Sequence, residues 1–211
     1  MVIDYGAGNI HSMARALERA GLAPVIAREP HEAEGAELIV LPGQGRFGQV
    51  ARAFATSGFE PLVRAHIDAD RPFLGVCVGL QLLLDGSEED PEVPGLGVLP
   101  GQVRRFRGDI RVPQMGWNSI VTFGDSSLFD GVADGSHVYF ANSYYAVPAS
   151  GSRLSGGATT TYGDTEFNSA FSSGNLHATQ FHPEKSQGVG LRMLRNLKAT
   201  IATPAGVSGA A

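Results

Sequence analysis

The stretch RPFLGVCVGLQLLL, residues 71–84, contains the only cysteine of the chain, placed between two glycines after an apolar run. The run before the cysteine is typical of a buried strand, and the leucine-rich segment after it is typical of a helix. The pattern G-x-C-x-G, from Gly75 to Gly79, is a thiol version of the nucleophile elbow, a sharp turn between a strand and a helix. Glycines are needed beside such a turn because a Cβ atom there would collide with the crossing backbone.

This position would also activate the thiol of Cys77. The partial positive charge of a helix N-terminus favours a thiolate, and the backbone N–H of Val78 points to where an oxyanion would form. We therefore predict that Cys77 is a nucleophile. The alternative is a small buried hydrophobic residue, which is how most free cysteines behave.

Further strand-like runs precede the elbow: MVID (1–4), APVIA (23–27) and AELIVLPG (36–43). Residues 9–21 place apolar side chains at helical spacing, with Asn9 as N-cap and Gly21 as the C-terminal stop. The order β-α-β predicts a parallel sheet whose strands are buried on both faces. Because the first run begins at Met1, we expect a short first strand or a natural start slightly upstream.

From about Leu99 the segments become richer in Thr, Tyr, Phe and turn residues, without long helical patterns between them. A last strand over 176–181 and an amphipathic helix over about 187–201 would close the fold. The predicted class is α/β: an open, mostly parallel sheet with helices on both faces and an antiparallel extension. We predict a single domain over residues 1–202 and a frayed tail over residues 203–211.

Composition narrows the functions open to the chain. Its 211 residues suffice for one domain with a substantial core, and 43% hydrophobic with 18% charged residues is ordinary for a soluble globular protein. A formal net charge of -5 makes nucleic acid a poor partner. We find no signal-peptide pattern and no membrane-spanning run, so we expect a cytoplasmic protein that binds neither nucleic acid nor membranes.

A thiol nucleophile needs a base, usually a histidine oriented by a third group. Of six histidines, His182 has the most distinctive setting, QFHPEKS at residues 180–186. It follows a strand-like run, Pro183 ends the strand, and Glu184 can accept a hydrogen bond from the imidazole. Cys77 and His182 would then share the carboxyl edge of the sheet, where open α/β folds bind ligands. The alternative is a solvated His and Glu on a loop.

Two glycine-rich turns follow other predicted strands. In LPGQGRFG (41–48), Gly43 and Gly45 allow close approach of a ligand or a peptide flip, although an ordinary glycine turn is the alternative. The turn DYGAGN (4–9) lacks the third glycine and the acidic residue of a dinucleotide fingerprint. The histidines also lack Cys or acidic partners at metal-site spacing, so we expect neither a cofactor nor a metal.

Together, these motifs resemble those of the class I glutamine amidotransferases, which use a Cys-His-Glu triad. Within that family the chain is similar to the glutaminase subunits of imidazole glycerol phosphate synthases, from histidine biosynthesis. The elbow and H-P-E are shared across the superfamily, whereas DYGAGN, MGWN and PEKS are more specific. The motifs occur in family order between Asp4 and Ser186: DYGAGN, LPGQGRFG, GVCVGLQLL, SEE, VPQMGWN, YFANSYY and QFHPEKS.

The resemblance implies a flavodoxin-like fold and a division of roles within the triad. Cys77 would attack the side-chain amide of glutamine. His182 would deprotonate the thiol and later protonate the departing ammonia, and Glu184 would orient His182. Water would then hydrolyse the glutamyl thioester to glutamate. The oxyanion would be held by the N–H of Val78 and, after a peptide flip that depends on the partner, by that of Gln44.

Further positions match those that hold glutamine in the family. Gln81 lies one helical turn beyond the nucleophile, and the carboxylate of Glu89 can meet the ammonium group of the substrate. The implied glutamine-binding residues are Gly45, Gln81, Glu89, Ser143 and Tyr144.

The family forms a heterodimer with a (β/α)8-barrel cyclase subunit, which uses the ammonia to make imidazole glycerol phosphate and an aminoimidazole carboxamide ribotide. An exposed Trp beside Met and Tyr also has the composition of an interface hot spot, although a core Trp is the alternative. The positions that match the docking face are Asn9, Ser12, Met115, Trp117, Asn118, Tyr139 and Lys185.

Three positions depart from the family pattern. Many members have an apolar residue at position 44 and His at positions 114 and 142, where this chain has Gln44, Gln114 and Asn142. Gln44 adds a side chain near the oxyanion hole. The other two, expected on the partner side, keep hydrogen-bonding ability but lose a titratable group. None of the three belongs to the triad. They therefore bear only on the glutaminase rate of the isolated chain and on how the partner stimulates it.

Three other functions remain open. Another triad glutaminase, of pyridoxal phosphate synthase or of the tryptophan pathway, shares the elbow and H-P-E but not MGWN and DYGAGN. A cysteine peptidase or deglycase with the same elbow would not require Gln81 and Glu89. A non-catalytic regulatory scaffold would not require an intact triad.

Overall fold

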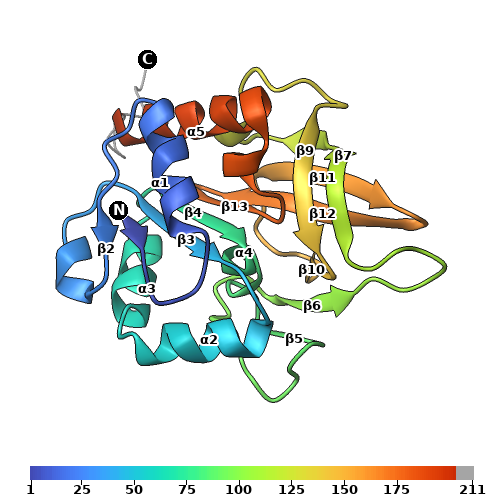
Figure 1. Ribbon diagram of the computed structural model, residues 1–211, viewed down its shortest axis with the longest axis horizontal. Coiled ribbons are helices and arrows are strands. Elements are labelled where there is room, and N and C mark those ends of the chain that lie inside the picture. Colours follow the sequence, from blue (N-terminus) through green and yellow to red (C-terminus); the bar gives the residue numbers. More distant parts are fainter. Residues whose placement is uncertain (203–211) are drawn as a thin grey trace.

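Parallel strands from both ends of the chain form the centre of the fold. The computed structural model describes residues 1–202. Its central strands are β1 (Val2–Ile3), β2 (Ile26–Ala27), β3 (Ile39–Gly43), β4 (Phe73–Cys77) and β13 (Leu176–Thr179). They lie in the order β2-β1-β3-β4-β13, all parallel (Figure 1). This is the 2-1-3-4-5 order of flavodoxin-like folds, so the predicted fold class is confirmed.

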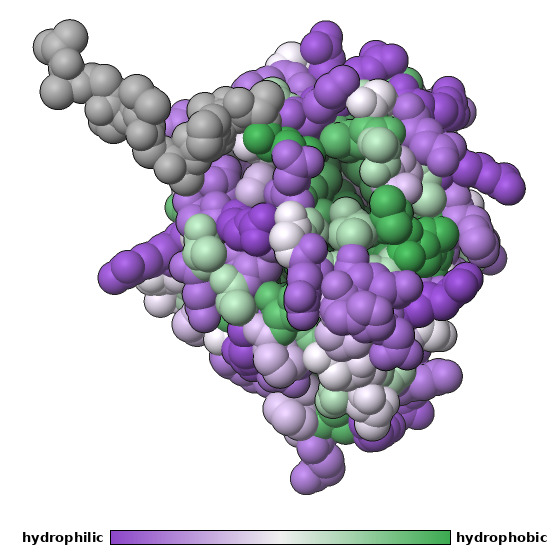
Figure 2. Space-filling view, turned by 90° about the vertical axis from the view of Figure 1, so that its left-hand side faces the viewer, coloured by the Kyte–Doolittle hydropathy of each residue, from purple (hydrophilic) through white to green (hydrophobic). Residues whose placement is uncertain are grey.

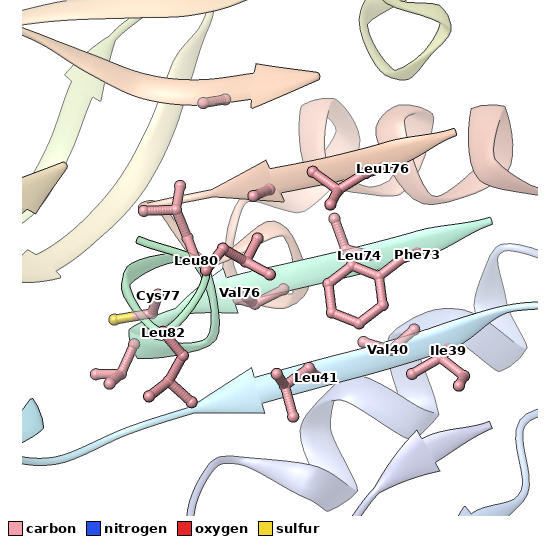
Figure 3. Packing of buried hydrophobic residues seen from close by; sticks show 14 of the residues in the cluster. Ile39, Val40, Leu41, Phe73, Leu74, Val76, Cys77, Leu80, Leu82 and Leu176 are labelled. Atoms are coloured by element: carbon pink, nitrogen blue, oxygen red, sulfur yellow. The ribbon is translucent and has the colours of Figure 1, made fainter. Parts of the chain in front are cut away.

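The strands β3 and β4 are buried at every residue because both faces of the sheet are covered. Figure 3 shows Val40 of β3 packed near Phe73 of β4, with Leu176 of β13 on the other side of β4. In the same view Cys77 ends this cluster, and its sulfur is directed away from the aliphatic side chains. The core therefore fixes the strand end while leaving the thiol at its edge.

Helices cover both faces of the sheet, as the sequence predicts. One face carries α1 (Ile10–Arg19) and α5 (Gln187–Ala202), and the other carries α2 (Phe47–Thr56) and α3 (Glu60–Asp68) (Figure 1). Asn9 is the N-cap residue of α1, but its side chain makes no capping hydrogen bond. Gly21 has a φ of 85° just beyond the C-cap, as the predicted stop requires.

The second half of the chain extends the sheet in antiparallel fashion, as predicted. β12 (Thr165–Ser173) pairs with β13, β10 (Tyr144–Pro148) with β12, and β6 (Gly101–Arg105) with β10. The short β5 (Gly86–Ser87) lies at the edge beside β6. A branch leaves β12 through β11 (Gly156–Tyr162) to β8 (Val121–Gly124).

One pair of strands does not join this sheet, which the sequence pattern did not predict. β7 (Gln114–Ser119) and β9 (His137–Asn142) form a separate antiparallel pair. Phe140 of β9 packs edge-to-face against Phe167 and Phe181, with ring centroids 6.1 Å and 5.7 Å away. This packing places β9 over the sheet rather than beside it.

The helix after the elbow is shorter than the leucine-rich pattern suggests. Helix α4 covers only Val78–Gln81. The backbone carbonyl oxygens of Leu82 and Leu84 accept hydrogen bonds from the N–H groups of Leu96 and Gly97, at 2.7 Å and 3.0 Å. A distant loop therefore takes the acceptors that a longer helix would have used. Single 3₁₀ turns occur at Pro30–Ala33, Ser127–Phe129 and Pro183–Lys185.

The end of the molecule that carries β2 is dominated by hydrophilic side chains, with smaller apolar areas between them (Figure 2). None of the helices within residues 1–202 combines the length and apolarity needed to cross a membrane. The tail expected over residues 203–211 lies outside the described residues.

Candidate active site

Cys77 occupies the sharp turn that its flanking glycines predict. Its φ of 56° and ψ of -109° lie outside the regions that L-residues normally adopt. A Cβ added to Gly75 would lie 2.9 Å from the carbonyl oxygen of Gly79, and one added to Gly43 would lie 2.5 Å from the nitrogen of Gly79. Glycines of β3, β4 and α4 therefore interlock to hold the elbow. The backbone at Cys77 is therefore a strained turn between a strand and a helix, the geometry that a nucleophile elbow requires.

His182 is held from two directions. Its Nδ1 lies 2.8 Å from Oε1 of Glu184, and both side chains are buried. Its backbone N–H donates to the carbonyl oxygen of Tyr139 in β9 at 2.9 Å. The hydroxyl of Ser186 donates to the backbone oxygen of His182 at 2.6 Å. Both the ring and the backbone are thus fixed, and the ring also hydrogen-bonds the side chain of Cys77.

The surroundings of His182 favour its charged form. Burial alone would lower the pKa of the imidazole. The hydrogen bonds to Cys77 and Glu184, together with the negative charges of these two side chains, outweigh burial and raise the pKa to about 10. The imidazole of His182 is therefore protonated at neutral pH, which suits an acid for a departing amine.

Gln180 is a member of this site that the sequence reasoning missed. It is fully buried, and its Nε2 donates to the sulfur of Cys77 at 3.6 Å. Its Oε1 accepts from Nε2 of Gln81 at 3.0 Å, and the same Nε2 reaches the carbonyl oxygen of Tyr144 at 3.3 Å. The signal available in the sequence was a glutamine at the end of an apolar strand, two residues before His182.

A cavity of about 310 Å³ opens beside the thiol. Its wall includes Cys77 and His182, and Glu184 lies behind His182. Both predicted oxyanion residues and all the predicted glutamine-binding residues line it. The lining residues are Gln44, Gly45, Cys77, Val78, Gln81, Glu89, Pro113, Ala141, Asn142, Ser143, Tyr144 and His182.

Two charged residues that the sequence reasoning did not select position Glu89. Oε2 of Glu89 accepts from the backbone N–H of Phe47 at 2.8 Å. The guanidinium of Arg46 binds the neighbouring Asp90 at 2.9 Å and also donates to the backbone oxygen of Glu89. Asp90 in turn accepts from the N–H of Gly48 at 2.9 Å. The start of α2 thus clamps the acidic loop to the wall of the cavity.

The turn DYGAGN supports the predicted oxyanion loop. The hydroxyl of Tyr5 donates to the carbonyl oxygen of Pro42 at 2.7 Å, and burial raises the pKa of this phenol. Gly8 has a φ of 120°, and a Cβ there would touch Pro42 at 3.3 Å. The first turn of the chain therefore packs directly against the segment that precedes Gln44.

Comparison with known proteins identifies the family of the chain. The sequence fits the family model "Glutamine amidotransferase class-I" over residues 1–199. It is 50% identical over 207 residues to the imidazole glycerol phosphate synthase subunit HisH of Deinococcus radiodurans, across 96% of this chain and 94% of that protein. The chain belongs to the class I glutamine amidotransferases. Its identity to the protein of the same name from Thermus thermophilus is 52% over 194 residues, across 92% of this chain and 93% of that protein.

Solved structures share the fold of this glutamine amidotransferase. A crystal structure of a glutamine amidotransferase has a TM-score of 0.73 at 21% identity, covering 96% of this chain and 99% of that chain. The structure of PurLQS from Thermotoga maritima also has a TM-score of 0.73, at 18% identity and with 95% of each chain covered. At such identities the likeness concerns the fold alone.

Two of the predicted docking residues of this amidotransferase are exposed, and the other five are half-buried. Met115 is 68% exposed and Trp117 is 47% exposed, so the tryptophan is not a core residue. The ring of Trp117 meets that of Tyr139 edge-on at 6.0 Å, and Nζ of Lys185 lies 5.7 Å from the centroid of Tyr139. Asn9, Ser12 and Asn118 are half-buried, and Asn118 donates to the carbonyl oxygen of Thr161.

Two of the three residues that depart from the family pattern are buried. Gln114 is 3% exposed and Asn142 is 5% exposed, whereas we expected both on the side that faces the partner. The register of β7 and β9 explains the difference, because it turns both side chains toward the interior while Met115 points outward. Gln44 is exposed at the mouth of the cavity. Within residues 1–202, no group of three or more His, Cys, Asp or Glu side chains could hold a metal ion.

Proposed function

We propose that residues 1–202 form one glutamine amidotransferase domain that serves as the glutaminase subunit of imidazole glycerol phosphate synthase in histidine biosynthesis. The observation that carries this proposal is the hydrogen-bonded line from Cys77 through His182 to Glu184, on the wall of a cavity that suits glutamine. The subunit assignment is supported by the extent of identity to proteins of that name.

In the first half of the reaction the thiolate of Cys77 attacks the side-chain amide carbon of glutamine. A carbon–sulfur bond forms, and the negative oxygen accepts hydrogen bonds from the N–H of Val78 and, after the peptide flip, from that of Gln44. When the intermediate collapses, the carbon–nitrogen bond breaks. The imidazolium of His182 gives its proton to the leaving nitrogen, which departs as ammonia.

In the second half, the neutral imidazole of His182 takes a proton from water as the water oxygen adds to the thioester carbon. The carbon–sulfur bond then breaks, glutamate leaves, and the thiolate and imidazolium are restored. Glu184 accepts from Nδ1 throughout, so the other ring nitrogen faces the reacting atoms.

Groups on the cavity wall fit the remaining parts of glutamine. The carboxylate of Glu89, already oriented by the N–H of Phe47, is available to the α-ammonium group. Nε2 of Gln81 is occupied within the protein, so its Oε1 is the atom left for substrate. Gly45, Ser143 and Tyr144 complete the enclosure.

The partner in this proposal is a (β/α)8-barrel cyclase, bound as a heterodimer in the cytoplasm. It would dock on the outer face of β7 and β9, where an aromatic residue and a methionine are exposed beside Lys185. Ammonia would pass to the cyclase, which forms imidazole glycerol phosphate and an aminoimidazole carboxamide ribotide.

The deciding experiment measures glutamate release from glutamine by the chain alone and by its complex with the cyclase loaded with nucleotide ligand. We expect strong stimulation by the loaded partner and no activity from Cys77→Ala. Equal rates with and without the partner would be consistent with the triad but would reject the partner-dependent peptide flip at Gln44. No glutamate in either arm, with peptide cleavage instead, would favour a peptidase.

A further inference from the structure

Gln114 and Asn142 stand opposite each other across β7 and β9, with both side chains on the inner face. In the part of the chain that the structure describes, neither Nε2 nor Oε1 of Gln114 has a hydrogen-bond partner, and neither has Oδ1 of Asn142. Nδ2 of Asn142 is satisfied by the carbonyl oxygen of Tyr144 at 3.0 Å. Burying unpaired amide atoms opposes folding, so this pair is better suited to a ligand than to stability.

The amide pair lies between the reaction cavity and the exposed docking face. Asn142 lines the cavity together with Cys77, and so does Pro113, the neighbour of Gln114. Alternate residues of a strand point to opposite faces, so Met115 and Trp117 are exposed on the outer side of the same strand pair. A small molecule released at Cys77 is therefore formed in the same cavity as Asn142, and Gln114 stands opposite Asn142 on the neighbouring strand.

The unpaired atoms specify what that molecule can be. Oε1 of Gln114 and Oδ1 of Asn142 are acceptors, and Nε2 of Gln114 is a donor. Neutral ammonia matches the set, because it has three N–H donors and one lone pair. Ammonium has no lone pair and would leave Nε2 unsatisfied. Amide side chains do not titrate, so they would not protonate ammonia. The ammonia therefore keeps the lone pair that it needs to act as a nucleophile.

We propose that Gln114 and Asn142 form a transit site for the neutral ammonia released at Cys77, on its way to the outer face of β7 and β9. The proposal rests on the proposed function, since it requires glutamine hydrolysis and a partner that consumes ammonia. Water offers similar hydrogen bonding, and a site that holds only water is the alternative that the experiment must separate.

The test uses the complex with the cyclase and measures the ratio of free ammonia to glutamate formed. Gln114→Leu removes the unpaired donor and one acceptor while leaving the bond from Asn142 to Tyr144. We expect this variant to raise the ratio by about fivefold, as the loss of one ordinary hydrogen bond would. The ratio does not depend on how fast glutamate is formed. Cyclase turnover on added ammonium salt should match that of the wild type.

Val138→Ala is the matched control, because it disturbs packing on the inner face of β9 without removing a polar group. It should keep the wild-type ratio. An unchanged ratio in Gln114→Leu, or an equal rise in Val138→Ala, would overturn the proposal and leave the proposed function standing. If Gln114→Leu does not fold, Gln114→Met decides the question in the same way. Failure of the wild-type complex to form glutamate would overturn both.

Discussion

The side-chain nitrogen of Gln180 donates a hydrogen bond to the sulfur of Cys77, although the two residues are 103 positions apart in the sequence. The oxygen of the same amide is held by Gln81, so the orientation of the donor is fixed. The thiol therefore has a neutral hydrogen-bond donor on one side and the imidazole of His182 on the other. A donor of this kind stabilises a thiolate without adding a titratable group.

Gln180→Leu should lower kcat for glutamate release by about tenfold, because the thiolate loses about one hydrogen bond of stabilisation. The rate at which iodoacetamide alkylates Cys77 at neutral pH should fall as well. Ser169→Ala, which removes another buried polar group, is the control for effects on folding alone. Alkylation at the wild-type rate in Gln180→Leu would argue against the interaction.

Cys77→Ser should abolish glutamine hydrolysis, by about 1,000-fold or more, while affinity for the cyclase is retained. The hydroxyl fits the elbow but is not ionised at neutral pH. Glutamate release and calorimetric titration with the cyclase check the two halves of this statement. Substantial residual hydrolysis would mean that another group attacks the substrate.

Asp90→Asn should raise KM for glutamine by about tenfold with little change in kcat, because Asp90 acts on substrate only by holding the loop of Glu89. Steady-state kinetics of the stimulated complex give both constants. Glu92→Gln, which removes an exposed charge from the same loop, should leave both constants unchanged. A fall in kcat at unchanged KM would place Asp90 in the chemical step instead.

Trp117→Ala should weaken binding of the cyclase by about 30-fold, as expected for a central aromatic residue of an interface. Lys185→Ala should weaken the stimulation of glutamine hydrolysis by the cyclase more than it weakens folding, since Lys185 is only half-buried and its ammonium lies over the ring of Tyr139 on the docking face. Isothermal titration and thermal melting of the isolated chain distinguish the two effects. Val121→Ala removes exposed apolar surface from β8, outside the predicted docking residues, and should bind normally. A large loss of melting temperature in Lys185→Ala would contradict the prediction.

Acid should destabilise the protein through His177. Burial lowers the pKa of its imidazole to about 4, although the negative charge of Asp70 opposes this shift. The unfolded chain, with a pKa near 6.5, binds a proton between pH 6.5 and 4 that the folded chain does not. Stability is therefore present above pH 6.5 and is lost as the pH falls toward 4, by up to about 1.4 kcal/mol per pH unit.

His177→Asn tests this pH dependence, because asparagine can still bond the hydroxyl of Ser172 that now lies 2.8 Å from Nδ1 of His177. Urea unfolding from pH 7 to pH 4.5 should show a shallower loss of stability in the variant than in the wild type. Parallel curves for the two proteins would assign the acid sensitivity to other groups.

The sequence was sufficient to predict the parts of the site that depend on local backbone geometry. The elbow at Cys77 follows from its two flanking glycines, and the position of His182 follows from the apolar run before it, although β13 ends at Thr179 rather than at the proline. The continuous apolar runs and their β-α-β order likewise predicted the central parallel sheet. Each of these features is determined by residues that are close in sequence.

The features that the sequence did not predict depend on distant contacts. Helix α4 ends early because residues 96 and 97 bind its trailing carbonyl groups. β9 leaves the main sheet because Phe140 packs on rings from β12 and the segment after β13. Gln180 was missed because its partners lie in other elements. The burial of Gln114 follows from a strand register that periodicity alone does not specify.

Tyr139 belongs to the docking face through its ring and to the base through its carbonyl oxygen, which holds the backbone of His182. A displacement of this one residue by a docked protein would act on the imidazole through a single hydrogen bond, without passing through the sheet. Substitutions of the ring leave that carbonyl in place. A mutation at position 139 can therefore change how the partner is recognised without changing how His182 is held. The hydrogen bond to His182 changes only if the backbone at position 139 moves.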